Sequence, residues 1–70
     1  MYAFVGKKEM GRRLVELRGD IPNKVAAACM GITPQSLSNY ESGERIPRDD
    51  VKAIIANYYN TSIERIFFLK

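Results

Sequence analysis

The sequence has no histidine, no tryptophan and a single cysteine, Cys29, among its 70 residues. A disulfide within the chain is therefore impossible, and zinc sites, which need several histidine or cysteine ligands, are not expected. We predict no metal and no other cofactor. Without a histidine to activate a nucleophile and without paired carboxylates at a plausible cleft, no catalytic constellation can be assembled. The composition thus predicts a protein that is not an enzyme.

Long apolar runs are missing as well, because no stretch approaches the length that spans a membrane. The opening MYAFVGKK carries its charges after its apolar residues, in the opposite order to a signal peptide. We therefore expect a cytoplasmic protein with no membrane partner, and one cysteine fits a reducing compartment. A chain of this length supports one domain, which we expect to span residues 1–70.

The charge permits a nucleic-acid partner without demanding one. The formal net charge is +3 and the sequence pI is about 9.2. The basic residues are unevenly placed, and those of the first third are Lys7, Lys8, Arg12, Arg13 and Arg18.

Apolar residues recur at helical spacing in several segments, and the prediction is an all-α fold of five helices without strands. The expected helices cover residues 6–18, 22–30, 34–42, 48–58 and 63–68. Their expected core stripes are Met10, Leu14 and Leu17; Val25, Ala26 and Cys29; Leu37 and Tyr40; Val51, Ile54, Ile55 and Tyr58; and Ile63, Ile66 and Phe67. Cys29 is expected to be a buried structural thiol. Gly11 lowers helix propensity, which suggests that another element packs closely there.

The stretch GITPQSLSNYESGERIP, residues 31–47, holds a short helix between two stop signals. Gly31 suits the left-handed position after a helix, Thr33 can cap the next helix, and Pro34 fits its first turn. Gly43 then ends that helix. On a helical projection, Gln35, Ser38, Asn39 and Ser42 form an outer face opposite Leu37, Tyr40 and Glu41, with Ser36 at the edge. A solvated polar face and a base-reading face both fit this pattern, because paired carboxamides can recognise adenine in the major groove.

The segment KVAAACMGITPQSLSNYESGERIP resembles the helix-turn-helix of the phage-repressor (Xre-type) family. The matching features are Val25-Ala26, Gly31-Ile32-Thr33, Leu37, Glu41-x-Gly43 and Pro47, and the closing Asn60-Thr61-Ser62-Ile63 is similar to the entry of the family's final helix. The resemblance covers about residues 11–68. It implies a five-helix, lambda-repressor-like DNA-binding fold whose helix-turn-helix is formed by helices 2 and 3.

The resemblance also assigns roles to individual positions. It implies base reading by Gln35, Ser36 and Asn39. Phosphate contacts are expected from Asn23, Lys24, Thr33, Ser38, Arg45 and Arg48. Structural positions are Arg18, Ala26, Gly31, Leu37, Tyr40, Glu41 and Gly43, with Arg18 and Glu41 expected to form an ion pair inside the domain. Two departures stand out: Pro22 replaces a phosphate-contacting glutamine of the family, and Pro34 replaces a base-reading glutamine of some members.

The expected function is sequence-specific binding of a double-stranded DNA operator by a transcriptional regulator, with repression by occupancy of the operator. With few cations per subunit, we expect a homodimer at least on DNA, with half-sites about one helical turn apart. Its expected interface draws on Tyr58, Tyr59, Phe67, Phe68 and Leu69. Two alternatives remain open: the antitoxin of a toxin–antitoxin pair, and a protein-interaction module on the same fold.

Overall fold

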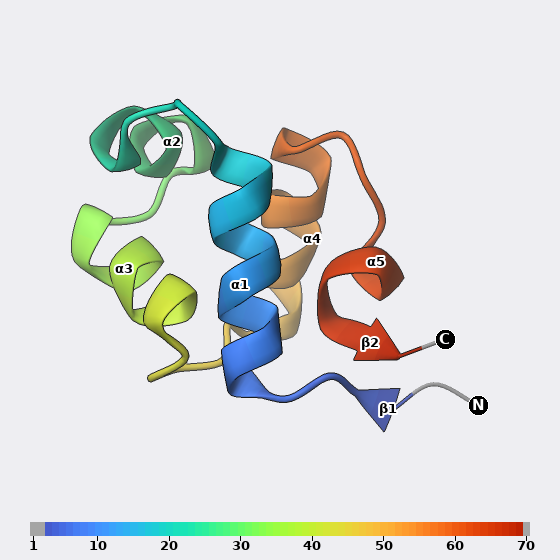
Figure 1. Ribbon diagram of the computed structural model, residues 1–70. Helices are drawn as coiled ribbons and strands as arrows, with labels where there is room; N and C mark the ends of the chain where they lie inside the picture. Colours follow the sequence, from blue (N-terminus) through green and yellow to red (C-terminus); the bar gives the residue numbers. More distant parts are fainter. Residues whose placement is uncertain (1–2, 70) are drawn as a thin grey trace.

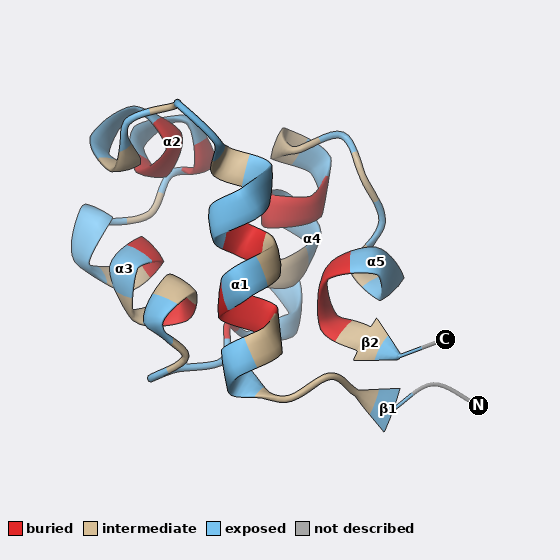
Figure 2. Ribbon diagram, viewed as in Figure 1, coloured by how far each residue is buried: buried red, intermediate tan, exposed pale blue. Residues whose placement is uncertain are grey.

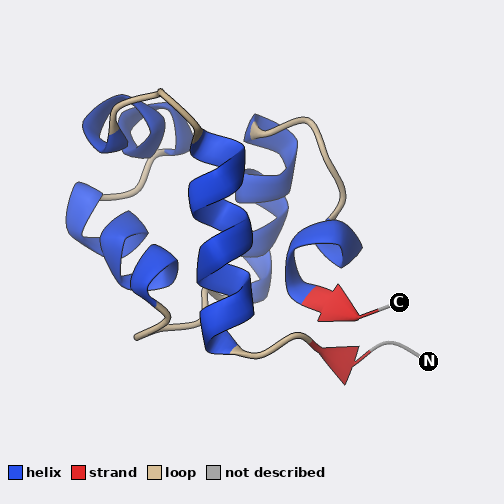
Figure 3. Cartoon of the chain, in the orientation of Figure 1, coloured by secondary structure: helices blue, strands red, loops and turns tan. Residues whose placement is uncertain are grey.

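The computed structural model describes residues 3–69, and five helices make up most of them (Figure 1, Figure 3). The elements in chain order are β1 (Ala3–Phe4), α1 (Lys7–Arg18), α2 (Asn23–Met30), α3 (Pro34–Ser42), α4 (Asp49–Tyr58), α5 (Ile63–Phe67) and β2 (Phe68–Leu69). The prediction of an all-α, five-helix architecture is therefore confirmed. The observed helices begin and end within one residue of the predicted bounds, and at each end that differs the expected first or last residue is a cap residue.

Helix α1 stands at the centre, with α2 and α3 on one side of it and α4 and α5 on the other (Figure 1). The core forms where these helices meet around α1 (Figure 2). Its fully buried large side chains are Met10, Leu14, Leu37, Ile55, Ile66 and Phe67. Burial of such side chains is the main stabilising term of a small helical fold. It also fixes α3 against α1, so that one face of α3 points inward and the other outward.

The prediction that the fold has no strands is wrong, because the structure contains one short strand pair. Strand β1 pairs with β2 in antiparallel register, Ala3 opposite Leu69 and Phe4 opposite Phe68. The amide of Val5 also donates to the carbonyl of Phe67 at 2.9 Å. A strand of two residues is too short to show the alternation of apolar and polar residues that indicates a strand. No local pattern could therefore predict a pairing between the two ends of the described chain.

The core face of α2 differs from the predicted one. Its buried residues are Ala26, Ala27 and Met30, whereas Val25 is 49% exposed and Cys29 is exposed. The prediction of a buried Cys29 thiol is therefore wrong. All residues from 25 to 30 are apolar, so periodicity alone could not choose the face, and the side with two alanines allows the closest approach to neighbouring helices.

Smaller corrections apply to the other stripes. Leu17 and Ile54 are 38% and 42% exposed and lie outside the core, although both were expected in it. Phe67 is fully buried within its own chain, so it cannot serve the dimer interface expected of it. Phe68 pairs with Phe4 and has the Lys52 ammonium 5.7 Å from its ring centre. Phe67 thus belongs to this chain's own core, and Phe68 packs against it.

Candidate nucleic-acid interface

Helices α2 and α3 are joined by a turn whose geometry follows from its sequence. Gly31 ends α2 in the left-handed conformation, with φ 73° and ψ 25°. The amide of Ile32 donates to the carbonyl of Ala27 at 3.0 Å, which satisfies the last turn of α2. The Thr33 hydroxyl then accepts the amide of Ser36 at 3.0 Å, and Pro34 occupies the first turn of α3. The turn therefore sets α3 at a defined angle to α2.

The two faces of α3 differ as predicted. Leu37 and Tyr40 are buried against the core, and the C-terminal cap Gly43 adopts the left-handed conformation with φ 81°. On the other side, Gln35 and Ser38 are exposed, and Asn39 is partly exposed. The outward face of α3 is thus polar and uncharged, and a partner can approach it.

The two carboxamides on that face are ordered against each other. The Gln35 Nε2 group donates to the Asn39 Oδ1 atom at 3.0 Å, one helical turn away. This bond leaves the Gln35 Oε1 acceptor and the Asn39 Nδ2 donor free for a partner. Side chains held in one arrangement lose less conformational entropy on binding than free ones.

A largely buried ion pair joins α3 to α1 on the side of α3 that faces the core. Arg18 donates to both carboxylate oxygens of Glu41, at 2.7 and 3.1 Å, and to the carbonyl of Ile21 at 2.8 Å. The side chains of Arg18 and Glu41 are 21% and 9% exposed. The hydrogen bond to Glu41 raises the pKa of Arg18 above its ordinary value, so the guanidinium stays protonated. A bidentate arginine–carboxylate interaction therefore fixes the C-terminal end of α1 to the C-terminal end of α3.

Close backbone packing accompanies this pair. A Cβ atom on Gly11 of α1 would lie 2.9 Å from the carbonyl carbon of Glu41, closer than side chains are found, so only glycine fits without a shift. The expected close packing at Gly11 is thus confirmed. Together with the ion pair, this contact prevents α3 from moving away from α1.

A hollow of about 550 Å³ lies between the start of α3 and the loop that leads to α4. Its lining includes the Thr33 and Ser36 hydroxyl residues and two arginines, Arg45 and Arg48. Both arginines are exposed, and Arg48 has a loose contact of 3.6 Å with Asp50. Hydroxyls beside guanidinium groups suit a phosphate. Four of the predicted interface residues are thereby brought to one place.

The other predicted phosphate contacts lie along the α2–α3 side. Asn23, at the start of α2, has its Nδ2 atom 3.4 Å from the Ser38 hydroxyl, and Lys24 beside it is exposed. These residues flank the outer face of α3 opposite the hollow. The start of α1 also lies near the helix-turn-helix, because Gly43 packs against the backbone of Lys7 and Lys8. No local motif marks that proximity, since it depends on how α1 and α3 pack.

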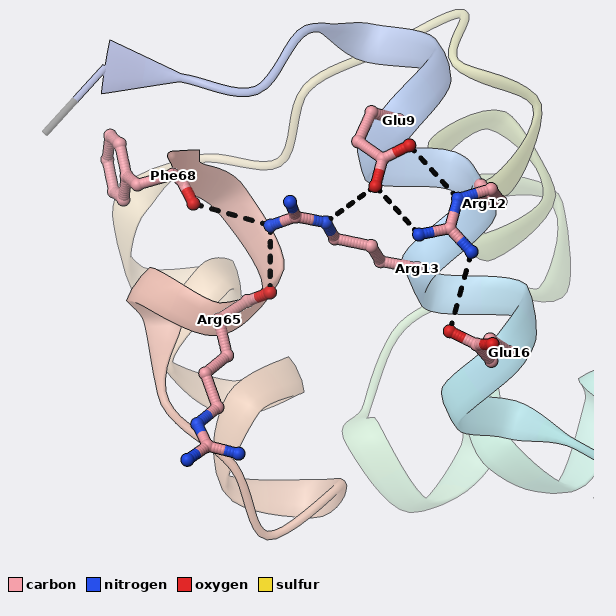
Figure 4. Close-up of polar contacts among 6 residues, drawn as sticks. All are labelled: Glu9, Arg12, Arg13, Glu16, Arg65 and Phe68. Carbon is pink, nitrogen blue, oxygen red and sulfur yellow. Dashed lines mark hydrogen bonds and ion pairs between the residues drawn. The ribbon is translucent and has the colours of Figure 1, made fainter. Parts of the chain in front are cut away.

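Glu9, Arg12, Arg13 and Glu16 form a second charged cluster on α1 (Figure 4). Arg13 also donates to the carbonyl oxygens of Arg65 and Phe68, at 2.9 and 3.3 Å. Hydrogen bonds from Arg12 and Arg13 lower the pKa of Glu9 to about 2. This cluster ties α1 to the end of α5.

Comparison with protein-family models gives a match to a helix-turn-helix family over residues 12–66, which includes α2, the turn and α3. Comparisons with curated proteins and with solved structures give no significant match. Within residues 3–69, no helix is long and apolar enough to cross a membrane. The family consists of DNA-binding regulators and is not typically enzymatic. With the capped turn and the inward Leu37 and Tyr40 in place, the matched range shows that the chain belongs to the phage-repressor-like (Xre-type) helix-turn-helix family.

Proposed function

We propose that the protein is a sequence-specific, double-stranded DNA-binding transcriptional regulator that inserts α3 into the major groove. The observation that carries this proposal is the outer face of α3, where Gln35 and Asn39 are exposed or partly exposed and hydrogen-bonded to each other. A carboxamide can both donate to and accept from the edge of an adenine, which gives base discrimination. Ser36, at the margin of this face, is the third proposed base contact.

Phosphate contacts would come from both sides of α3. The hollow with Thr33, Ser36, Arg45 and Arg48 supplies hydroxyls and cations on one side. Asn23, Lys24 and Ser38 supply polar and basic groups on the other. Such contacts fix the register and orientation of a protein on the duplex, and they leave base recognition to the groove. Binding of this kind over a promoter would repress transcription.

A dimer on DNA is part of the proposal. Each subunit has few cations at the interface, so a second subunit would double the phosphate contacts and steepen the salt dependence. Of the residues first expected at the dimer interface, Leu69 is 52% exposed and remains available, whereas Phe67 is buried. Light scattering at high concentration, with and without DNA, tests this point. A monomeric mass under both conditions would contradict it.

The base-reading role is tested by replacing Gln35 and Asn39 with alanine, singly and together. Each substitution should reduce the discrimination between the preferred duplex and a scrambled duplex by about 1–3 kcal/mol. Replacing Arg45 instead should weaken binding to both duplexes alike. Titrations by fluorescence anisotropy against both duplexes measure the two effects. Unchanged discrimination in the double variant would refute the assignment.

A protein-interaction module remains the second candidate, and one observation favours it. Within residues 34–42 the only charged side chain is Glu41, which is engaged by Arg18, so the outer face of α3 offers no cation to DNA. The same titration separates the two candidates, because a module without nucleic-acid affinity would bind neither duplex even at low salt. An antitoxin would bind DNA and, in addition, a toxin partner.

A further inference from the structure

Lys7 and Lys8, at the start of α1, lie beside the end of the proposed recognition helix α3. Gly43 ends α3, and a Cβ atom built on it would lie 3.0 Å from the carbonyl oxygen of Lys7 and 3.4 Å from the amide nitrogen of Lys8. Figure 1 shows the first turn of α1 next to the loop that follows α3. Both lysine side chains are exposed. Two exposed cations therefore lie at the C-terminal end of α3.

Ion pairing separates these lysines from half of the basic residues within residues 3–69. The cations engaged with carboxylates within 4.0 Å are Arg12, Arg13, Arg18, Arg48 and Lys52. Those without such a partner in the described part of the chain are Lys7, Lys8, Lys24, Arg45 and Arg65. All but Arg65 lie on or next to the helix-turn-helix, and Arg65 lies on α5 across α1 from α3 (Figure 1). Four of these five unpaired cations thus lie around α3.

On α1, the unpaired lysines are followed about one turn later by two arginines that are paired with carboxylates. Arg12 and Arg13 share the carboxylate of Glu9, and Arg12 also meets Glu16 at 3.5 Å (Figure 4). Because the acids of α1 are committed to these arginines, they do not neutralise the two lysines. A flexible lysine stem can reach a phosphate several ångströms from its own backbone.

We propose that Lys7 and Lys8 contact DNA phosphates beyond the C-terminal end of α3, in addition to Lys24 and Arg45. This inference rests on the proposed function, because it requires α3 to lie in the major groove. The groove is about 12 Å wide, so a helix inside it is flanked by a phosphate backbone on each side. Cations at the start of α2, in the loop after α3 and at the start of α1 would then surround α3 and hold it in place.

The test measures how the affinity of the full chain for one duplex of about 20 base pairs falls with salt. Four proteins are compared: wild type, Lys7→Gln/Lys8→Gln, Lys7→Arg/Lys8→Arg and Arg65→Gln. Glutamine has a helix propensity close to that of lysine, and circular dichroism melting checks that each variant folds. The slope of log affinity against log salt should become shallower by about 0.9 for each lysine that contacts a phosphate. The arginine variant should keep the wild-type slope, and so should Arg65→Gln, which removes an unpaired charge away from α3.

The outcomes separate this inference from the proposed function. A wild-type slope retained by Lys7→Gln/Lys8→Gln overturns the role of the lysines while leaving DNA binding intact. Equal losses per removed charge in Lys7→Gln/Lys8→Gln and in Arg65→Gln also overturn it, because they would reflect net charge and not contact. Failure of the wild type to bind any duplex at low salt overturns the proposed function and this inference together.

Discussion

Helix α1 carries two arginine–carboxylate clusters, and their comparison shows how burial decides what a charge does. The Arg18–Glu41 pair joins two helices and is 21% and 9% exposed. The Glu9–Arg12–Arg13–Glu16 cluster lies on one helix and is more open to solvent. Arg12 and Glu16 are 59% and 73% exposed, and Glu9 is 35% exposed, whereas Arg13, at 23%, is about as covered as Arg18. The exposed cluster lowers the pKa of Glu9 to about 2, yet solvent screens its contribution to stability. We conclude that the buried pair positions α3, while the exposed cluster mainly supports α1 and the end of α5.

The largest expected effect comes from breaking the buried pair. Glu41→Gln keeps the shape of the side chain but leaves the Arg18 guanidinium without its counter-charge in a mostly buried site. We expect a loss of about 2–3 kcal/mol in the free energy of unfolding, below the range for a fully buried pair because Arg18 keeps some solvent contact. Urea unfolding measures it. A loss no larger than that of Glu16→Gln in the exposed cluster would contradict the contrast between the two.

A smaller effect is expected where α1 and α3 touch through their backbones. Gly11→Ala gains helix propensity of about 1 kcal/mol but places a methyl group against the carbonyl of Glu41. Overpacking of this kind costs about 1–3 kcal/mol, so the net change should be destabilising by up to about 2 kcal/mol. Thermal unfolding monitored by circular dichroism tests this. If Gly11→Ala raised the melting temperature, as alanine does at a helical glycine with open space around it, then α1 and α3 would have to move apart at little cost.

The smallest effect is expected in the exposed cluster, and it should depend on pH. The pKa of Glu9 is lowered from 4.5 to about 2, so its contribution is present above pH 4.5 and lost as the pH falls toward 2. Glu9→Gln should therefore lower the free energy of unfolding at neutral pH, but by less than Glu41→Gln does. Near pH 2 the free energies of unfolding of Glu9→Gln and wild type should converge. A constant difference from pH 7 to pH 2 would show that the charge of Glu9 is not the cause.

Local chemistry made much of the fold predictable. Gly31, Thr33, Pro34 and Gly43 act through their own backbone and side-chain preferences, and the turn and α3 were predicted from them. Resemblance to a family supplied the pairing of Arg18 with Glu41, which no local pattern contains. The structure shows where the residues proposed to read bases and to contact phosphates lie. Their roles in DNA binding are proposals.

What could not be predicted depends on contacts distant in sequence. Residues 25–30 are apolar throughout, so only packing against α3 and α4 turns Ala27 inward and Cys29 outward. The pairing of Ala3 with Leu69 joins opposite ends of the described chain. Likewise, the hollow between the start of α3 and the α3–α4 loop, and the position of Lys7 beside Gly43, arise only from the folded arrangement.

The central claim is that the outer face of α3 reads bases, and selection of bound duplexes from a random DNA pool tests it most directly. Wild-type protein should enrich a near-palindrome with half-sites about one helical turn apart. The Gln35→Ala/Asn39→Ala variant should bind more weakly and lose preference at specific positions within each half-site. Enrichment of the same sequence by wild type and variant, or no enrichment by wild type, would contradict the claim.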